Sequence, residues 1–132
     1  MDIIRYDMLN SKYLCSKLPE LKEKIFIENE YLGQNLPHSL YGNVLNPIVV
    51  ALIKEDGYEN NDLLKKIFEF YEQMAKYGDE EVRNLLQVTL LEYLWDDYVV
   101  YTRSMKLMGK NTLKINKEIS NYLYVPESND IT

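Results

Sequence analysis

The sequence predicts an all-α fold, either a single-domain helical bundle or a short stack of helical hairpins with about five to seven helices. Apolar residues recur at three- and four-residue spacings along most of the chain, which is the period of an amphipathic helix. The 132 residues include only five glycines and four prolines, so few positions favour a turn. We expect one helical domain over 1–125 and a flexible C-terminal tail over 126–132.

The N-terminal part predicts three helices. Residues 3–16 have helical spacing, and residues 19–32 have a proline in the first turn, where it suits a helix. Residues 33–38 form a turn-rich connector. The third helix is expected to begin with Asn46 as its cap and Pro47 at its first helical position.

Residues 62–77 have the clearest helical pattern of the chain. One side is apolar and the opposite side is charged, so Glu72 is expected at the surface beside Lys76. The apolar stripe contains Leu63, Leu64, Ile67, Phe68, Tyr71, Met74 and Ala75. Gly78 is expected in the left-handed conformation that ends many helices. Asp79 then caps an antiparallel second helix, because a link this short joins an αα-hairpin.

The second helix of this hairpin, over 80–97, is apolar on more than one side, which is typical of a helix in the centre of a bundle. No glycine or proline occurs over 79–108. We therefore favour one long helix that continues towards Gly109 over a break near Asp96. A last helix is expected over 112–124, with a short strand around Leu113 as the alternative.

Residues that could carry chemistry are few. The one histidine, His38, has no serine placed for a nucleophilic triad, and Cys15 lies on an apolar stripe typical of a buried thiol. Di-iron bundles use Glu-x-x-His motifs on facing helices, and no such motif occurs in this sequence. Glu69 and Glu72 are expected on the polar side of their helix. Glycine-rich phosphate-binding motifs are absent from the sequence. We expect neither catalysis nor a bound metal or cofactor.

The charge balance points to protein partners. A net charge of −6 argues against nucleic-acid binding, and the N-terminus has no signal-peptide pattern. The longest apolar run, 48–53, is much shorter than the roughly 18 residues that span a membrane. A cytoplasmic protein is expected. The charge is −8 over 55–97 and +5 over 98–117, which either attracts a partner of opposite charge or is balanced within the fold.

The helix over 80–97 also carries the predicted partner-binding site. On a regular α-helix six of its residues share one arc: Glu81, Leu85, Val88, Glu92, Trp95 and Asp96. An aromatic anchor bordered by carboxylates is typical of a protein interface. In the alternative interpretation other helices cover this arc, and Leu85 and Val88 belong to the core.

Five short motifs occur in a characteristic order along residues 18–97. They are Leu18-Pro19-Glu20-Leu21, Leu36-Pro37-His38, Phe70-Tyr71-Glu72, Gly78-Asp79-Glu80-Glu81-Val82-Arg83-Asn84-Leu85 and Leu91-Glu92-Tyr93-Leu94. This order resembles an uncharacterised family of small all-helical bacterial proteins, some of which resemble the immunity proteins of polymorphic toxin systems. The resemblance carries over no catalytic residue. It implies an immunity protein that binds and neutralises a cognate toxin domain, expected to be basic. The alternative is a helical adaptor or regulatory domain without a toxin partner.

Overall fold

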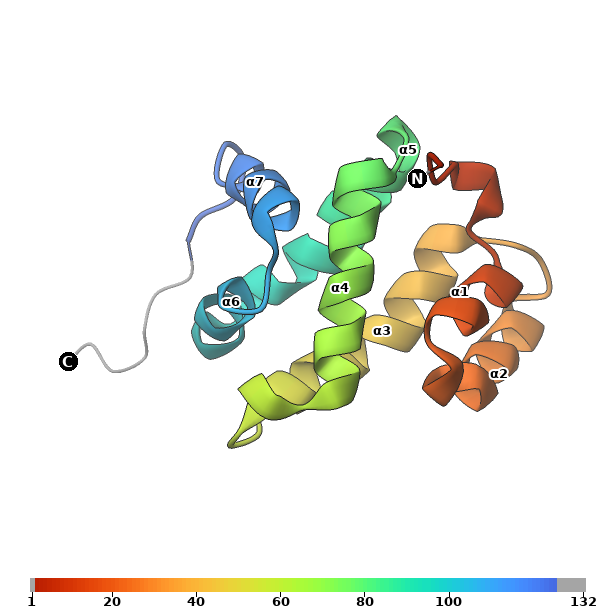
Figure 1. Ribbon diagram of the computed structural model, residues 1–132, viewed down its shortest axis with the longest axis horizontal. Helices are drawn as coiled ribbons and strands as arrows, with labels where there is room; N and C mark the ends of the chain where they lie inside the picture. The colour runs from red at the N-terminus through yellow and green to blue at the C-terminus, as the bar shows by residue number, and fades with distance from the viewer. Residues whose placement is uncertain (1, 126–132) are drawn as a thin grey trace.

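The computed structural model describes residues 2–125, which contain seven α-helices and no β-strand (Figure 1). The helices are α1 (Ser11–Lys17), α2 (Lys22–Leu32), α3 (Pro37–Ile53), α4 (Asp62–Tyr77), α5 (Glu80–Leu85), α6 (Tyr98–Met105) and α7 (Lys110–Ile119). Four short 3₁₀ segments and one π-helical segment join them: η1 (Tyr6–Met8), η2 (Pro19–Leu21), η3 (Tyr58–Asn60), the π-helical η4 (Leu86–Leu91) and η5 (Glu92–Asp96). The predicted all-α fold is confirmed, and the predicted tail over 126–132 lies outside the described residues. No helix in the described part of the chain is long and apolar enough to cross a membrane.

Helix α4 runs through the middle of the molecule and organises the packing. In Figure 1, α1 and α2 lie on one side of it, and α6 and α7 lie on the other. Its predicted apolar stripe is buried except for the half-buried Leu63, with Phe68 only 2% exposed and its ring packed against Tyr71 at a centroid distance of 5.0 Å. The side chain of Asn61 accepts a hydrogen bond from the Leu64 N–H (2.9 Å), so the predicted cap is confirmed.

The turn between α4 and α5 differs from the prediction at Gly78. Gly78 has φ −71° and ψ 147°, which is extended and not left-handed. The N-terminal segment pairs with this turn, because the Ile4 N–H donates to the Tyr77 carbonyl (2.8 Å) and the Ile4 carbonyl accepts from the Asp79 N–H (2.9 Å). Asp79 caps α5 as predicted, through its bond from the Val82 N–H (2.9 Å).

The predicted helix over 3–16 is confirmed over 11–16 and wrong before that. Ile4 bridges to Gly78, and helix α1 begins only at Ser11. The side chain of Asn10 accepts from the Tyr13 N–H (2.9 Å), so Asn10 caps α1 instead of continuing a helix. Asparagine competes with the helical backbone for hydrogen bonds, which explains why helical spacing alone placed the boundary too early.

The predicted helix start at Asn46 and Pro47 is also wrong, because α3 runs through both residues from Pro37. Pro47 deprives the Asn43 carbonyl of its helical hydrogen bond. Both residues are exposed, so water can take the place of the missing N–H. Asn46 is buried and donates to the Thr89 carbonyl (3.0 Å), which makes it a contact between helices and not a cap.

The expected long helix over 80–109 is broken at Asp97, which has φ −135° and ψ 128°. Its side chain accepts from the Val100 N–H (3.1 Å) and caps α6. The segment before the break packs closely on α3, since a Cβ atom added to Gly42 would lie 2.9 Å from Thr89 Cγ2. The alternative prediction of a break near Asp96 is therefore confirmed, and the favoured prediction of one continuous helix is wrong.

Helix α7 is held by Glu72, which corrects the prediction of a solvated Glu72. The carboxylate accepts four hydrogen bonds, from the backbone N–H groups and side chains of Asn111 and Thr112, at 2.7–3.1 Å. Gly109 is the N-cap residue of α7 and has no side chain of its own to cap it. A Cβ atom there would lie 2.6 Å from Glu72 Cδ. Leu113 is helical, so the alternative of a strand is wrong.

Candidate partner-binding site

The structure divides the six residues of the predicted partner-binding arc between the core and the surface. Leu85 and Trp95 are buried, with exposed fractions of 0% and 5%. Glu81, Val88 and Asp96 are exposed, and Glu92 is half-buried. The arc is therefore not a single surface. The alternative interpretation holds for Leu85 but not for Val88, which is 40% exposed.

The arc fails because the segment over 80–97 is not one α-helix. It is α-helical in α5, π-helical in η4 and 3₁₀-helical in η5. A π turn contains more residues than an α turn, and a 3₁₀ turn contains only 3.0. A constant 100° per residue therefore places Glu92, Trp95 and Asp96 at the wrong angles relative to Glu81.

Trp95 has a structural role that the predicted interface did not include. Its indole N–H donates to Asn116 Oδ1 (2.9 Å), and its ring stands edge-on to Tyr101 at a centroid distance of 4.7 Å. These contacts join η5 to α6 and α7. The indole also forms one wall of an apolar hollow of about 380 Å³, beside Met105 and Leu113. Trp95 is thus not an exposed anchor.

Glu92 binds Tyr122, which lies near the end of the described chain. Its carboxylate accepts a hydrogen bond from the Tyr122 hydroxyl (2.9 Å). Burial and this hydrogen bond raise the pKa of Tyr122 to about 12. Glu92 therefore ties residues after α7 to η5.

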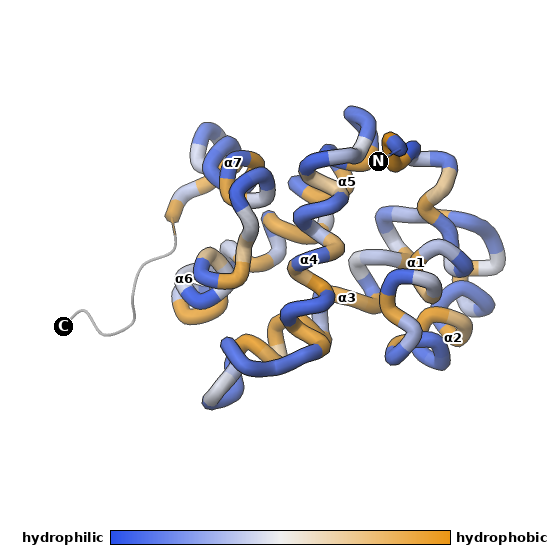
Figure 2. Tube along the Cα trace, viewed as in Figure 1, coloured by the Kyte–Doolittle hydropathy of each residue, from blue (hydrophilic) through white to orange (hydrophobic). Residues whose placement is uncertain are grey.

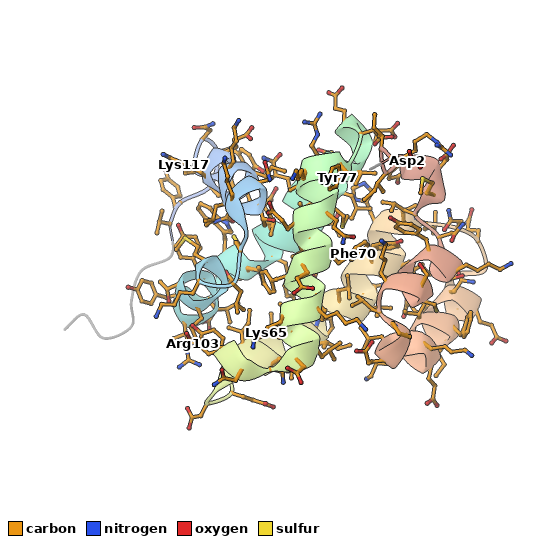
Figure 3. The ribbon with its side chains drawn as sticks, in the orientation of Figure 1. Asp2, Lys65, Phe70, Tyr77, Arg103 and Lys117 are labelled. Carbon is orange, nitrogen blue, oxygen red and sulfur yellow. The ribbon has the colours of Figure 1, made fainter. Side chains whose placement is uncertain are left out.

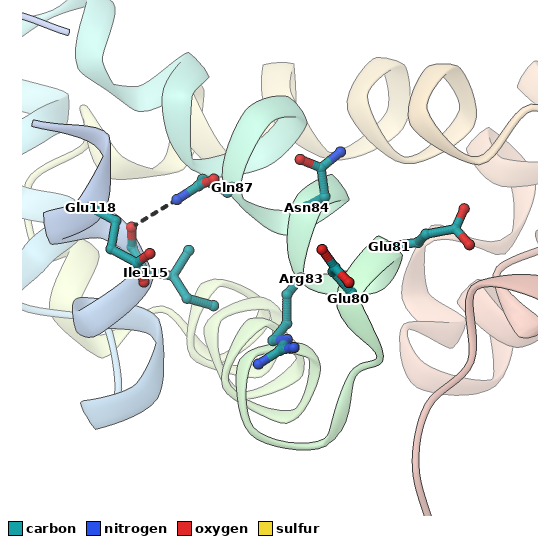
Figure 4. A pocket seen from close by; sticks show the side chains of 7 residues that line it. All are labelled: Glu80, Glu81, Arg83, Asn84, Gln87, Ile115 and Glu118. Atoms are coloured by element: carbon teal, nitrogen blue, oxygen red, sulfur yellow. Dashed lines mark hydrogen bonds between the residues drawn. The ribbon is translucent and has the colours of Figure 1, made fainter. Parts of the chain in front are cut away.

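A hollow of about 510 Å³ between α5 and α7 is the strongest candidate site that includes a predicted residue (Figure 4). Its lining residues are Glu80, Glu81, Arg83, Asn84, Gln87, Ile115 and Glu118. Gln87 donates to the Ile115 carbonyl (3.4 Å) and so connects the two walls. In Figure 4, Glu81 extends away from the other side chains, at the rim of the hollow.

The charges of this α5–α7 hollow are unbalanced. It has three carboxylates and a single guanidinium, that of Arg83. Within residues 2–125, none of these four groups takes part in a salt bridge. The pKa of Tyr6 is raised by its burial and by the negative charge of Glu81. The residues that line the hollow therefore carry a net charge of −2 at pH 7.

Sequence reasoning found only Glu81 among these lining residues. Glu80 is the neighbouring acid in the sequence and lies in the first turn of α5, where the positive end of the helix dipole favours it. Glu118 gave no signal, because α7 is far from α5 in the sequence and only the fold brings them together. The acidic balance of residues 55–97 was the one pattern that pointed to this end of the molecule.

The basic segment over 98–117 forms α6, α7 and the link between them, and Figure 3 shows Arg103 and Lys117 on the same side of the molecule. Arg103 donates to the Ile53 carbonyl (2.9 Å) at the end of α3 and lies over the ring of Tyr58. This basic residue thus stabilises the fold. Lys117, in α7, is exposed.

The chain matches the model of one protein family, described as Domain of unknown function (DUF7674), over residues 11–123. It belongs to this family. The match extends beyond the motifs over 18–97 and includes all seven helices, from the first residue of α1 to the end of α7. No curated protein and no solved structure matches the chain. The description of DUF7674 names no activity, substrate or partner.

The residues with catalytic potential do not converge in this DUF7674 chain. His38 lies in the first turn of α3, not in a loop, and its Nδ1 is hydrogen-bonded to Thr89 Oγ1. Burial raises the pKa of the Cys15 thiol, against a smaller opposite effect of Lys22. A raised pKa disfavours the reactive thiolate. In the described part of the chain, no three His, Cys, Asp or Glu residues are grouped so that they could hold a metal ion.

Proposed function

We propose that this DUF7674 chain is a cytoplasmic immunity protein that binds a basic surface of a cognate bacterial toxin domain and neutralises it without catalysis. The observation that carries the proposal is the α5–α7 hollow, whose lining residues include three carboxylates and a single guanidinium. The resemblance over residues 18–97 supports the choice of a toxin as the partner. The alternative function is that of a helical adaptor for a basic protein unrelated to toxins.

The hollow suits a protein partner because its walls are fixed before binding. Asp79 caps α5 and also accepts a hydrogen bond from the Tyr6 N–H (2.9 Å), which ties the N-terminal segment to the same turn. Glu72 fixes α7 from the neighbouring α4. Walls whose backbone is already fixed lose little backbone conformational entropy on binding. If the toxin is a nuclease, these carboxylates occupy the positions of substrate phosphates.

Binding at the hollow is electrostatically steered. Glu80 and Glu81 lie in the first turn of α5 and Glu118 lies near the end of α7, so both walls of the hollow carry carboxylates. Such an arrangement accelerates association with a basic partner, and salt weakens the effect. Inhibition then follows from covering the active site or substrate surface of the toxin.

The non-catalytic part of the proposal rests on His38 and Cys15. Thr89 engages one ring nitrogen of His38, and the raised pKa of Cys15 disfavours its thiolate. Neither residue lines the α5–α7 hollow. The carboxylates of the hollow therefore have no nucleophile or imidazole beside them.

The test begins with the gene directly upstream: where it encodes a large secreted protein, the C-terminal domain of that protein is used as the toxin, and a metabolic gene there would count against the immunity role. We expect Glu81→Lys with Glu118→Lys to slow association about tenfold or more at low salt, with a smaller effect at about 0.5 M salt. Biosensor kinetics measure the rate, and growth of cells that express the toxin measures protection. Glu55→Lys with Glu59→Lys is the matched control, because it makes the same change in net charge at two exposed residues at the opposite end of α4 (Figure 1).

Three results would contradict the proposal in different ways. Normal binding and protection by the double variant would exclude the α5–α7 hollow as the contact. Failure of the unaltered chain to bind or protect against the upstream domain would exclude the immunity role. Binding of that domain without any protection would favour the adaptor function.

A further inference from the structure

The apolar hollow beside Trp95 lies between η5, α6 and α7 and has a volume of about 380 Å³. We call it the Trp95 hollow; it shares no lining residue with the α5–α7 hollow. Figure 2 shows hydrophobic and hydrophilic residues interleaved along α6 and α7, which form two of its walls. Its lining includes Trp95 of η5, Tyr101 and Met105 of α6, and Leu113 and Lys117 of α7.

The walls of the Trp95 hollow are fixed by contacts within the chain. The indole of Trp95 donates to Asn116 Oδ1 (2.9 Å) and stands edge-on to Tyr101. The hydroxyl of Ser120, which also lines the hollow, donates to the Lys117 carbonyl (2.7 Å). A group that enters the hollow therefore meets mainly apolar walls and one charged residue, the exposed Lys117.

The size and chemistry of the hollow suit one large apolar side chain of a partner protein. Ligand pockets have volumes of roughly 300–1,000 Å³ and contain a few polar groups that converge on the ligand. The Trp95 hollow is near the lower limit of this range, and the side chains of Asn116 and Ser120 already have partners. Apolar pockets with a charged rim are typical positions for the anchor residue of a protein interface.

The surface around the hollow is basic. Residues 98–117 contain five basic residues and no acid. On α7, three lysines and Leu113 recur at three- and four-residue spacings, so they share the outward side of the helix. Within residues 2–125, four exposed lysines of α6, α7 and the link between them take part in no salt bridge: Lys106, Lys110, Lys114 and Lys117.

Most acids near this basic surface in the sequence have other contacts. Glu118 lines the α5–α7 hollow, Glu92 accepts the hydrogen bond from Tyr122, and Asp97 caps α6. Asp96 is exposed at the end of η5. The exposed lysines therefore outnumber the acids that could neutralise them, and the surface is complementary to an acidic partner.

From these observations we infer that the Trp95 hollow and the lysines around it bind an acidic linear segment of a partner protein. One large apolar side chain of the segment occupies the hollow, and its carboxylates lie against Lys114 and Lys117. Clusters of basic side chains recognise acidic motifs in this way. The inference does not depend on the immunity function, because the two hollows are separate and suit partners of opposite charge. A short segment with one anchor should bind with a dissociation constant of about 100 μM.

The test uses the full chain and a synthetic peptide that has one phenylalanine between two pairs of glutamates. Trp95 is the only tryptophan in the sequence, so its fluorescence reports on the hollow. The peptide should shift the Trp95 emission and reduce its quenching by acrylamide, with saturation near about 1 mM. Alanine in place of the phenylalanine, or lysines in place of the glutamates, should weaken binding about tenfold or more.

Charge reversal on α7 tests the location of the contact. Lys114→Glu with Lys117→Glu should weaken peptide binding about tenfold or more, and the loss should shrink at about 0.5 M salt. Lys12→Glu with Lys24→Glu is the matched control, because it makes the same change in net charge at exposed lysines of α1 and α2, on the other side of α4. Circular dichroism melts should show that both variants fold.

Several results would overturn the inference. One is a Trp95 emission that does not change with about 2 mM peptide, and another is equal binding of the lysine peptide. Equal losses of affinity in the α7 variant and its control would exclude this surface. Binding of anionic vesicles without binding of the peptide would identify a lipid surface as the occupant. A Trp95 emission that changes with protein concentration alone would identify a second copy of the chain, and either finding would overturn the proposed segment.

Discussion

Helix α4 and the segment Leu86–Asp96 are both mostly apolar and lie next to each other in the fold, yet their backbones have different helical geometries. Helix α4 is a regular α-helix with one buried side, and its ends lie at Asp62 and Tyr77, as its pattern predicts. The segment Leu86–Asp96 is π-helical and then 3₁₀-helical. Its neighbours are α3, α4, α6 and α7.

The difference shows how far a helical pattern determines its own geometry. Helix α4 needs only one apolar side to be covered, so any compact arrangement preserves its α-helical hydrogen bonds. The segment Leu86–Asp96 is buried against several elements, and their positions decide its twist. The close contact of Gly42 with Thr89 and the bond from Asn46 to the Thr89 carbonyl fix η4 against α3.

The largest expected loss in the free energy of unfolding is that of Trp95→Ala, and Phe68→Ala provides the comparison in α4. Phe68→Ala should lower the free energy of unfolding by roughly 3–5 kcal/mol. Trp95→Ala should cost roughly 1–3 kcal/mol more, because the truncation also leaves the buried Asn116 Oδ1 without its donor. Urea unfolding at pH 7 measures both values.

Trp95→Phe is the control, since it keeps most of the apolar volume and removes only the indole N–H. We expect it to lose roughly 1–3 kcal/mol. A Trp95→Ala variant with unchanged stability would show that Trp95 is not part of the core. It would also return Trp95 to consideration as an interface anchor.

A medium effect is expected for Glu72→Gln, which tests how α4 holds a distant helix. Burial acts to raise the pKa of Glu72, but the hydrogen bonds from Thr112 and Asn111 outweigh it, and the pKa is lowered. The ionised form is thus stabilised in the folded chain. The ionised carboxylate therefore stabilises the fold at pH values above about 4.3, the ordinary pKa of a glutamate in an unfolded chain. This stabilisation is lost as the pH falls through the lower pKa that Glu72 has in the folded chain.

At pH 7 Glu72→Gln should therefore cost roughly 1.5–3 kcal/mol, the range for a hydrogen bond to a charged group. The difference from the unaltered chain should shrink between about pH 5 and pH 3. Chemical unfolding at a series of pH values measures it. Glu69→Gln is the control, because Glu69 lies exposed on the same helix. Equal effects of the two substitutions at every pH would contradict the assigned role of Glu72.

The smallest effect is expected at the two helix caps. Asn61 caps α4 and Asp97 caps α6 after the break, each through one side-chain bond to a backbone N–H. Replacement of either by alanine should cost about 1 kcal/mol. Thermal unfolding compares them. A much larger loss for Asp97→Ala would show that the break at Asp97 depends on its cap more than on the packing of η5.

Several features of this chain were determined by the sequence alone. The all-α class, the burial of the α4 stripe and the caps at Asn61 and Asp79 all follow from local spacing and side-chain hydrogen bonds. These interactions involve residues no more than four positions apart, and nearby sequence is enough to specify them. Glu81 was placed correctly at the surface for the same reason.

Other features depended on contacts between distant residues. The extended Gly78 follows from pairing with Ile4, the fixed α7 follows from Glu72, and the continuous α3 uses Asn46 to reach Thr89. The predicted arc failed because packing changed the helical twist between Glu81 and Trp95. The α5–α7 hollow likewise depends on bringing Glu118 near Glu80. Local sequence cannot specify these contacts, because their energies arise only when separate helices meet in the folded chain.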